Sequence, residues 1–174
     1  MEREQIVAGV ISAAGGSMTG RVRLQKTVYL LDQLNLGSGF GYEYHYYGPY
    51  SADLTAATAD AKAFGLIDEQ IEYRRSDGAQ FSIFELRDNR ETLVADAFGL
   101  LGKANAQRCI AVMNRYSATA LELAATIDWL WRYERRSDWQ REIQRRKGLK
   151  TAEGRLEKAI ELLQEIGLHP PANS

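Results

Sequence analysis

Residues 42–54, YEYHYYGPYSADL, constrain the fold more than any other stretch of this chain. Side chains alternate over residues 42–47, and aromatic residues favour strands, so a short, half-buried strand is predicted there. The Gly-Pro pair at 48–49 then ends it, because proline lacks an amide donor and glycine tolerates unusual dihedrals. Ser51 follows as a helix N-cap, and Asp53 lies in the first turn, where a carboxylate suits the helix dipole. The stretch therefore predicts a strand, a tight corner and a helix.

The bulk composition is that of a globular chain. The 174 residues are 45% hydrophobic and 26% charged, and they contain three prolines. The single cysteine, Cys109, excludes an internal disulfide and fits a reducing cytoplasm; it is expected to be a small core residue. No apolar run approaches the roughly 20 residues that span a bilayer, and the N-terminus lacks a signal-peptide pattern. We therefore expect a cytoplasmic protein without a membrane partner.

The first half of the chain has the element order of a winged helix. Helices are predicted over residues 2–14 and about 20–35, the second capped by Thr19. The strand and corner described above lead to a third helix, 52–64, and then to two strands joined by an Asp-Gly turn at 77–78. In a winged helix the third helix would be the recognition element and residues 67–87 the wing.

Three basic residues lie at the start of the second predicted helix, which is the unfavourable end for the dipole: Arg21, Arg23 and Lys26. We expect them to be solvated. The alternative is that they meet an acidic partner.

The second half is expected to be helical. An apolar stripe at Leu93, Val94 and Ala97 continues through Ile110 and Met113. Further helices are predicted after two caps, Ser117 and Thr151, the last one over about 151–166. The predicted fold class is thus α+β and mostly helical. We expect a winged-helix-like N-terminal domain, residues 1–88, and a C-terminal helical extension, residues 89–174, that packs on it.

Charge is distributed unevenly along the chain. Residues 132–150, the basic run, carry eight basic and three acidic side chains, against 12 basic and 16 acidic in residues 1–131. A nucleic-acid surface could use this run with the wing. Its candidate residues are Arg74, Arg75, Arg135, Arg136, Arg141, Arg145, Arg146 and Lys147. The alternative is a solvated helix face with pairs such as Glu142 with Arg146.

Little in the sequence indicates an enzyme. Histidine occurs at positions 45 and 169 alone, and no His/Cys spacing typical of zinc sites and no phosphate-binding loop motif is present. A Ser-His-acid arrangement would have to use His45 and Ser51, but Ser51 is better explained as a helix cap. We therefore predict no catalytic residue, no metal and no cofactor.

Two function classes remain. The first is a non-enzymatic regulatory or protein-interaction module, because tyrosines are good interface anchors and the Ala-rich third helix allows close approach. Its candidate partner-binding residues are Tyr44, His45, Tyr47, Tyr50 and Asp53. The same tyrosines could instead serve core and turn packing. The second class is a nucleic-acid-binding transcriptional regulator, possible as a homodimer through its C-terminal helices. The third helix has Asp53, Asp60 and one Lys62, which weakens that case.

Three motifs carry a family resemblance: GRVRLQKTVYLL (residues 20–31), YEYHYYGPYSADL (42–54) and FGLIDE (64–69). With them the chain resembles the YwgA-type family of small bacterial and archaeal proteins, over about two thirds of its length. It is more distantly similar to the Panacea domain of antitoxins. The resemblance implies a fold, a cytoplasmic location and, through the antitoxin link, a protein partner such as a toxin. It implies no catalytic residues.

Overall fold

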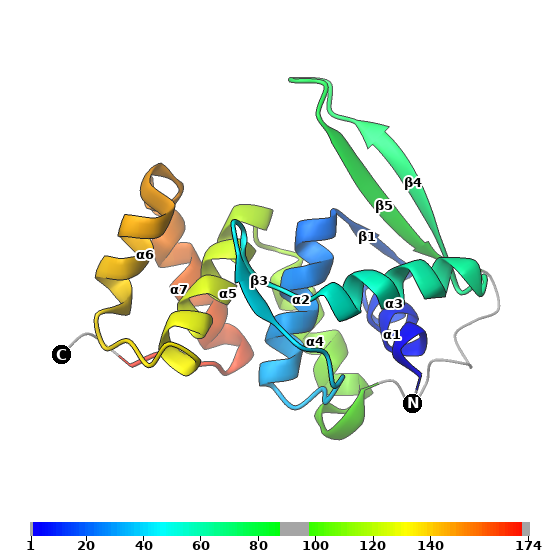
Figure 1. Ribbon diagram of the computed structural model, residues 1–174, viewed down its shortest axis with the longest axis horizontal. Helices are drawn as coiled ribbons and strands as arrows, with labels where there is room; N and C mark the ends of the chain where they lie inside the picture. Colours follow the sequence, from blue (N-terminus) through cyan, green and yellow to red (C-terminus); the bar gives the residue numbers. More distant parts are fainter. Residues whose placement is uncertain (1, 88–97, 172–174) are drawn as a thin grey trace.

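The computed structural model of the protein describes residues 2–87 and 98–171 (Figure 1). Its elements form a mixed α and β fold that is mostly helical, with strands in the N-terminal half and helices in the C-terminal half, as predicted. The expected apolar stripe at Leu93, Val94 and Ala97 lies outside the described residues, as does the expected domain boundary. Within the described part, no helix combines the length and apolarity that crossing a bilayer would need.

Three helices form the centre of the N-terminal half: α1 (Arg3–Ala13), α2 (Arg21–Gln33) and α3 (Ala52–Ala63). The Ser51 hydroxyl accepts a hydrogen bond from the Leu54 amide, so the predicted cap of α3 is confirmed. The predicted cap of α2 is wrong. Thr19 belongs to a short strand, β1 (Ser17–Thr19), and Gly20 at φ +98° precedes the helix instead.

The strands β4 (Ile67–Tyr73) and β5 (Gln80–Leu86) form the predicted antiparallel ribbon, which projects from the helical body (Figure 1). Strand β1 pairs with β5, with Met18 opposite Phe84, so the sheet order is β1-β5-β4. Sequence reasoning missed β1 because three residues between glycines carry too little periodicity to reveal a strand. Whether the arrangement is that of a winged helix stays a prediction.

The second half contains α4 (Lys103–Met113), α5 (Ala118–Arg132), α6 (Trp139–Lys147) and α7 (Arg155–Ile166), with the 3₁₀ turns η2 (Gly99–Leu101) and η3 (Gly148–Thr151). The Ser117 hydroxyl accepts from the Ala120 amide, so the cap of α5 is confirmed. The Thr151 cap is wrong. The Thr151 hydroxyl donates back to the Gly148 carbonyl, and α7 begins only after Gly154, which is left-handed.

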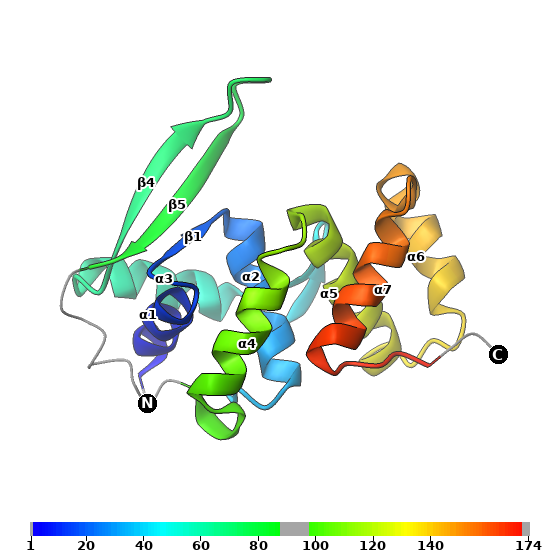
Figure 2. The same ribbon diagram turned by 180° about the vertical axis from the view of Figure 1, so that it is seen from behind.

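Helix α5 is the central element of the hydrophobic core. It is buried over most of its circumference and contacts α2, α6, α7 and the strand β3. Figure 2 shows α7 on the side of α5 that faces away in Figure 1, with α4 beside it in front of α2. An all-round apolar helix is typical of the middle of a core. Two acidic residues, Glu122 and Asp128, are buried in it, and both need partners.

Candidate functional site

Residues 42–50 form a hairpin, here called the tyrosine hairpin, rather than one strand and a corner. Strand β2 (Glu43–His45) pairs antiparallel with β3 (Gly48–Tyr50), with Tyr44 opposite Pro49 and His45 opposite Gly48. The expectation that Gly48-Pro49 ends the strand was wrong, because both residues belong to β3. Each strand of a two-stranded ribbon is an edge strand, and a proline is tolerated there because it can occupy a position whose backbone nitrogen needs no hydrogen bond to a neighbouring strand. Gly48 adopts φ +88°, which makes the reversal possible.

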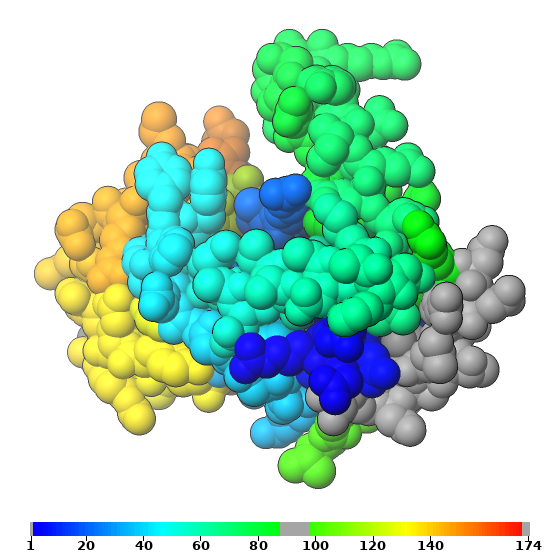
Figure 3. Space-filling model, turned by 45° about the vertical axis from the view of Figure 1, so that its right-hand side comes forward, coloured from blue at the N-terminus to red at the C-terminus, as the bar shows by residue number. Residues whose placement is uncertain are grey.

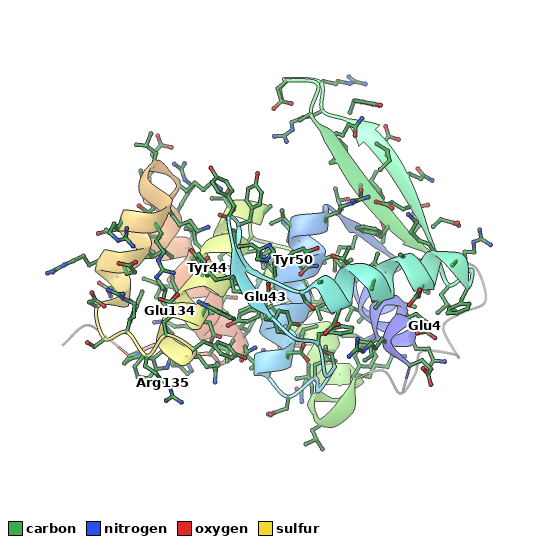
Figure 4. The ribbon with its side chains drawn as sticks, viewed as in Figure 1. Glu4, Glu43, Tyr44, Tyr50, Glu134 and Arg135 are labelled. Atoms are coloured by element: carbon green, nitrogen blue, oxygen red, sulfur yellow. The ribbon has the colours of Figure 1, made fainter. Side chains whose placement is uncertain are left out.

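The structure divides the candidate tyrosines between the two sides of the hairpin (Figure 4). Tyr44 faces α5 and α6, where its ring lies 4.8 Å from the Arg146 guanidinium and 6.2 Å from the ring of Trp129. Tyr50 faces the other side and stacks on His45 at 4.6 Å. Burial raises the pKa of the Tyr44 hydroxyl, so Tyr44 has the character of a packing residue.

The turn of the hairpin exposes two aromatic rings. Tyr46 is 81% exposed and Tyr47 49%, and their rings meet edge to face at 4.9 Å. Asp53 is not brought near them. Its carboxylate accepts from the Gly41 amide at 2.9 Å and pairs with Arg3 at 3.1 Å, so it anchors the entry of the hairpin to α1.

A hollow of about 480 Å³, here called the hairpin pocket, opens between the tyrosine hairpin, α3 and the β4–β5 ribbon. Figure 3 shows it between the cyan hairpin and the green ribbon, with the blue of α2 at its floor. The sequence-predicted residues that line it are His45, Tyr47 and Tyr50; Tyr44 and Asp53 do not. Its remaining lining is Arg21, Val22, Leu24, Gln25, Lys26, Tyr46, Gly48, Thr55, Thr58, Ala59, Lys62, Glu69 and Phe84.

Lys26 lies at the floor of the hairpin pocket and contradicts the expectation of a solvated residue. It is 2% exposed, and its ammonium donates to the Pro49 carbonyl at 2.5 Å. Burial lowers the pKa of Lys26 to about 8, with the attraction of Glu122 opposed by nearby Lys147 and Lys150. Sequence reasoning missed Lys26 although a signal existed: Tyr29 and Leu30, three and four positions later, belong to the buried face of α2.

Arg21 and Arg23, the other two basic residues at the start of α2, also have partners within the protein. The Arg23 guanidinium donates to the Met113 and Tyr116 carbonyls, and Arg21 pairs with Glu69 at 2.7 Å. Glu69 also accepts from Lys62 and from the Ser82 hydroxyl. Burial alone would raise the pKa of Glu69, but the hydrogen bonds from Lys62, Ser82 and Arg21 outweigh it and lower the pKa to about 2. This cluster joins α2, α3 and the ribbon at the pocket wall.

Glu69→Gln is expected to destabilise the protein by about 2 kcal/mol at pH 7, because Arg21 and Lys62 lose their shared carboxylate. The pKa of Glu69 is depressed in the folded state, so its contribution is present above the unfolded value near 4.5 and disappears as the pH falls towards 2. Urea unfolding of both proteins at pH 7, 4, 3 and 2 should show the gap closing on acidification. Glu85→Gln on β5 is the matched control and should show a smaller loss of stability at pH 7, because Glu85 forms no ion pair in the described residues.

The basic run is largely neutralised within the protein. Six of its eight basic side chains make ion pairs, which are Arg132–Asp128, Arg136–Asp138, Arg145–Glu142, Arg146–Glu134, Lys147–Glu122 and Lys150–Glu122. The predicted Glu142–Arg146 pair is confirmed at 2.7 Å. Within residues 2–87 and 98–171, Arg135 and Arg141 are exposed and form no ion pair.

The wing candidates stand apart from that run. Arg74 pairs with Asp77 at 3.4 Å near the tip of the ribbon, and Arg75 is exposed there. A second hollow, of about 390 Å³, lies on the other side of the tyrosine hairpin and is lined by Tyr44, His45, Tyr46, Arg146, Lys147 and Lys150. The structure thus brings Arg146 and Lys147 to the hairpin but leaves the wing arginines at the far end of the ribbon.

Across 2–87 and 98–171, no group of three or more His, Cys, Asp and Glu side chains is placed to hold a metal ion. Cys109 is buried, and burial raises the pKa of its thiol. Ser51 is fully buried and is used as the helix cap.

Among curated proteins, the chain is similar to the uncharacterised protein YwgA of Bacillus subtilis (strain 168). The two are 28% identical over 119 residues, which is 64% of this chain and 65% of that protein. The chain thus spans somewhat less than two thirds of its relative's length. No protein-family model matches the chain. The similarity supports a YwgA-like family, which is the family that the three sequence motifs resemble.

Proposed function

We propose that this protein is a non-enzymatic interaction module that holds a segment of a partner protein in the hairpin pocket. The observation that carries the proposal is that the two candidate surfaces, the tyrosine hairpin and α3, line one hollow. His45, Tyr46, Tyr47 and Tyr50 come from the hairpin, and Thr55, Thr58, Ala59 and Lys62 come from α3. Concave surfaces of mixed aromatic and small side chains are suited to binding.

The rim of the pocket has the features of an interface anchor. Tyr46 and Tyr47 stand exposed at the turn, where they present large apolar rings with polar tips. Ala59, exposed on α3 opposite them, leaves room for an incoming chain. The lysines beneath the turn limit its movement, because Lys147 donates to the Tyr46 carbonyl at 2.9 Å. A pre-ordered rim lowers the entropy cost of binding. A regulatory, antitoxin-like role would suit such a module.

Nucleic-acid binding is the second proposal and has less support. It would use the element order of a winged helix, the wing arginines and the exposed Arg135 and Arg141 of the basic run. Most cations of that run already face carboxylates, which lowers the positive potential that a phosphate backbone would meet. Helix α3, the would-be recognition element, carries Asp53 and Asp60 against Lys62.

A pair of alanines on α3 provides a sharp test. Ala59 lines the hairpin pocket, whereas Ala56, one turn earlier and also exposed, does not. Ala59→Trp should fill the pocket and reduce capture of the partner from a lysate of the source organism at least 10-fold. Ala56→Trp should retain capture. Quantitative mass spectrometry of the captured proteins, after thermal unfolding has shown both variants folded, is the measurement.

The same variants separate the two proposals. Equal capture by both variants would refute binding in the pocket. Binding of random duplex DNA at 50 mM salt that Ala59→Trp leaves intact and Arg141→Glu weakens would favour the nucleic-acid proposal instead.

A further inference from the structure

Lys26 has binding capacity that the protein itself does not use. An ammonium carries three donors. Within residues 2–87 and 98–171, the hydrogen bond to the Pro49 carbonyl is the one that Lys26 Nζ makes. The side chain is almost fully buried, and it lines the floor of the hairpin pocket. A buried charge with unfilled donors is costly, and an anion entering the pocket would remove that cost.

The charges around Lys26 favour an anion. Lys26, Lys147 and Lys150 all lie near Glu122, so one buried carboxylate is shared among three ammonium groups. The carboxylate that lines the pocket, that of Glu69, is already paired with Arg21 and Lys62. The surroundings of Lys26 therefore carry more ammonium groups than carboxylates, although Lys147 and Lys150 themselves line the other hollow.

The walls restrict which anion can enter. Val22, Leu24, Ala59 and Phe84 line the pocket beside the tyrosines, so the body of the ligand should be apolar. A phosphate dianion prefers several converging donors, but the guanidinium of Arg21 is held by Glu69. A singly charged carboxylate on an apolar residue matches one buried ammonium in an apolar hollow.

From these observations we infer that the hairpin pocket binds the C-terminal carboxylate of the partner chain, with Lys26 as its counter-ion and the last apolar side chain against Phe84 and the tyrosines. This inference rests on the proposed function and names the part of the partner that enters. Lys26 would then bridge the ligand and the Pro49 carbonyl, so that the carboxylate is bound against the tyrosine hairpin itself.

Nuclear magnetic resonance of the full chain with labelled lysines tests the inference. The probes are a library of N-acetylated tetrapeptides ending in Leu, Ile, Val or Phe, its carboxamide counterpart, octanoate and inorganic phosphate. At pH 7 the free-acid library should bind at least 10-fold more tightly than the carboxamides and should raise the pKa of Lys26. Lys26→Met should abolish this preference, and Lys158→Met, an exposed lysine on α7, should keep it.

A second measurement does not depend on any variant. In the wild type the preference for the free acid should fade as the pH rises from 7 to 9.5, because Lys26 loses its proton in that range. Equal affinity for acid and amide, or a preference that survives in Lys26→Met, would overturn the inference. If octanoate or phosphate bound through Lys26 and the free-acid peptides did not bind, the ligand would not be the C-terminal carboxylate of a protein. If both peptide libraries bind equally and Ala59→Trp blocks them, the inference fails while the proposed function stands.

Discussion

Glu122→Gln is expected to lower the free energy of unfolding by about 3 kcal/mol at pH 7, among the largest effects of any single change. The Glu122 carboxylate is buried in α5 and pairs with Lys147 at 2.8 Å and Lys150 at 3.0 Å. Lys147 is itself buried, with a side chain only 4% exposed. A neutral amide would leave that ammonium without a counter-charge, which is more costly than losing an exposed pair. Urea unfolding monitored by tryptophan fluorescence measures the loss.

A double variant separates lost charge from lost packing. Lys147→Met removes the buried ammonium and keeps an unbranched apolar chain, so Glu122→Gln/Lys147→Met should recover at least half of the loss. Glu157→Gln, at an exposed position on α7, is the control and should change stability by less than about 0.5 kcal/mol. A Glu122→Gln effect as small as that of Glu157→Gln would contradict the role of the buried pair.

Gly48→Ala is the second variant with a large expected effect, and it should also lower the free energy of unfolding by about 3 kcal/mol. Two costs combine at this position. The backbone has φ +88°, which an L side chain rarely adopts, and an added Cβ would lie 2.5 Å from Thr126 Oγ1 on α5. Because the Thr126 hydroxyl donates to the Glu122 carbonyl, it cannot move away freely. The hairpin should therefore shift from α5, and thermal unfolding should show a clear fall in Tm.

Gly78→Ala is the matched control for the cost of placing an alanine at a positive φ. It has φ +72° at the tip of the ribbon, and an added Cβ would meet nothing within 4 Å, so Gly78→Ala should cost only about 1 kcal/mol. Adding Thr126→Ala to Gly48→Ala removes the oxygen that clashes with the new Cβ. The double variant should regain the stability lost to the clash, but not the stability lost to the strained backbone. If Gly48→Ala and Gly78→Ala destabilise equally, the close approach to α5 does not constrain the hairpin.

Local signals in the sequence predicted much of the fold. Ser51 and Ser117 cap their helices because a hydroxyl just before a helical apolar pattern can accept a hydrogen bond from an amide of the first turn. The Asp-Gly pair at 77–78 marks the ribbon turn because the turn needs a positive φ. In each case the structure is determined by residues within a few positions of one another.

The candidate site was predicted less well because it depends on contacts between distant segments. The buried ammonium of Lys26 has its hydrogen-bond acceptor in the carbonyl of Pro49, 23 positions later, which no local pattern reveals. Glu122 and Lys147 are paired across 25 positions, and the charge pattern of the basic run shows only its surplus of cations. The alternation over residues 42–47 separates Tyr44 from His45 and Tyr47, but it does not indicate which of the two sides faces a pocket.

The edge of the ribbon has a consequence for self-association. In the described sheet β4 is an outer strand, so one side of its backbone faces no neighbouring strand. Its side chains include Glu72, which is exposed and forms no ion pair within residues 2–87 and 98–171, whereas Asp68 and Glu69 already have basic partners. Two copies that met along this edge would bring carboxylates together, and like-charged neighbours resist strand addition. The ribbon should therefore be protected against aggregation, and an additional strand from another chain would have to be rich in lysine or arginine.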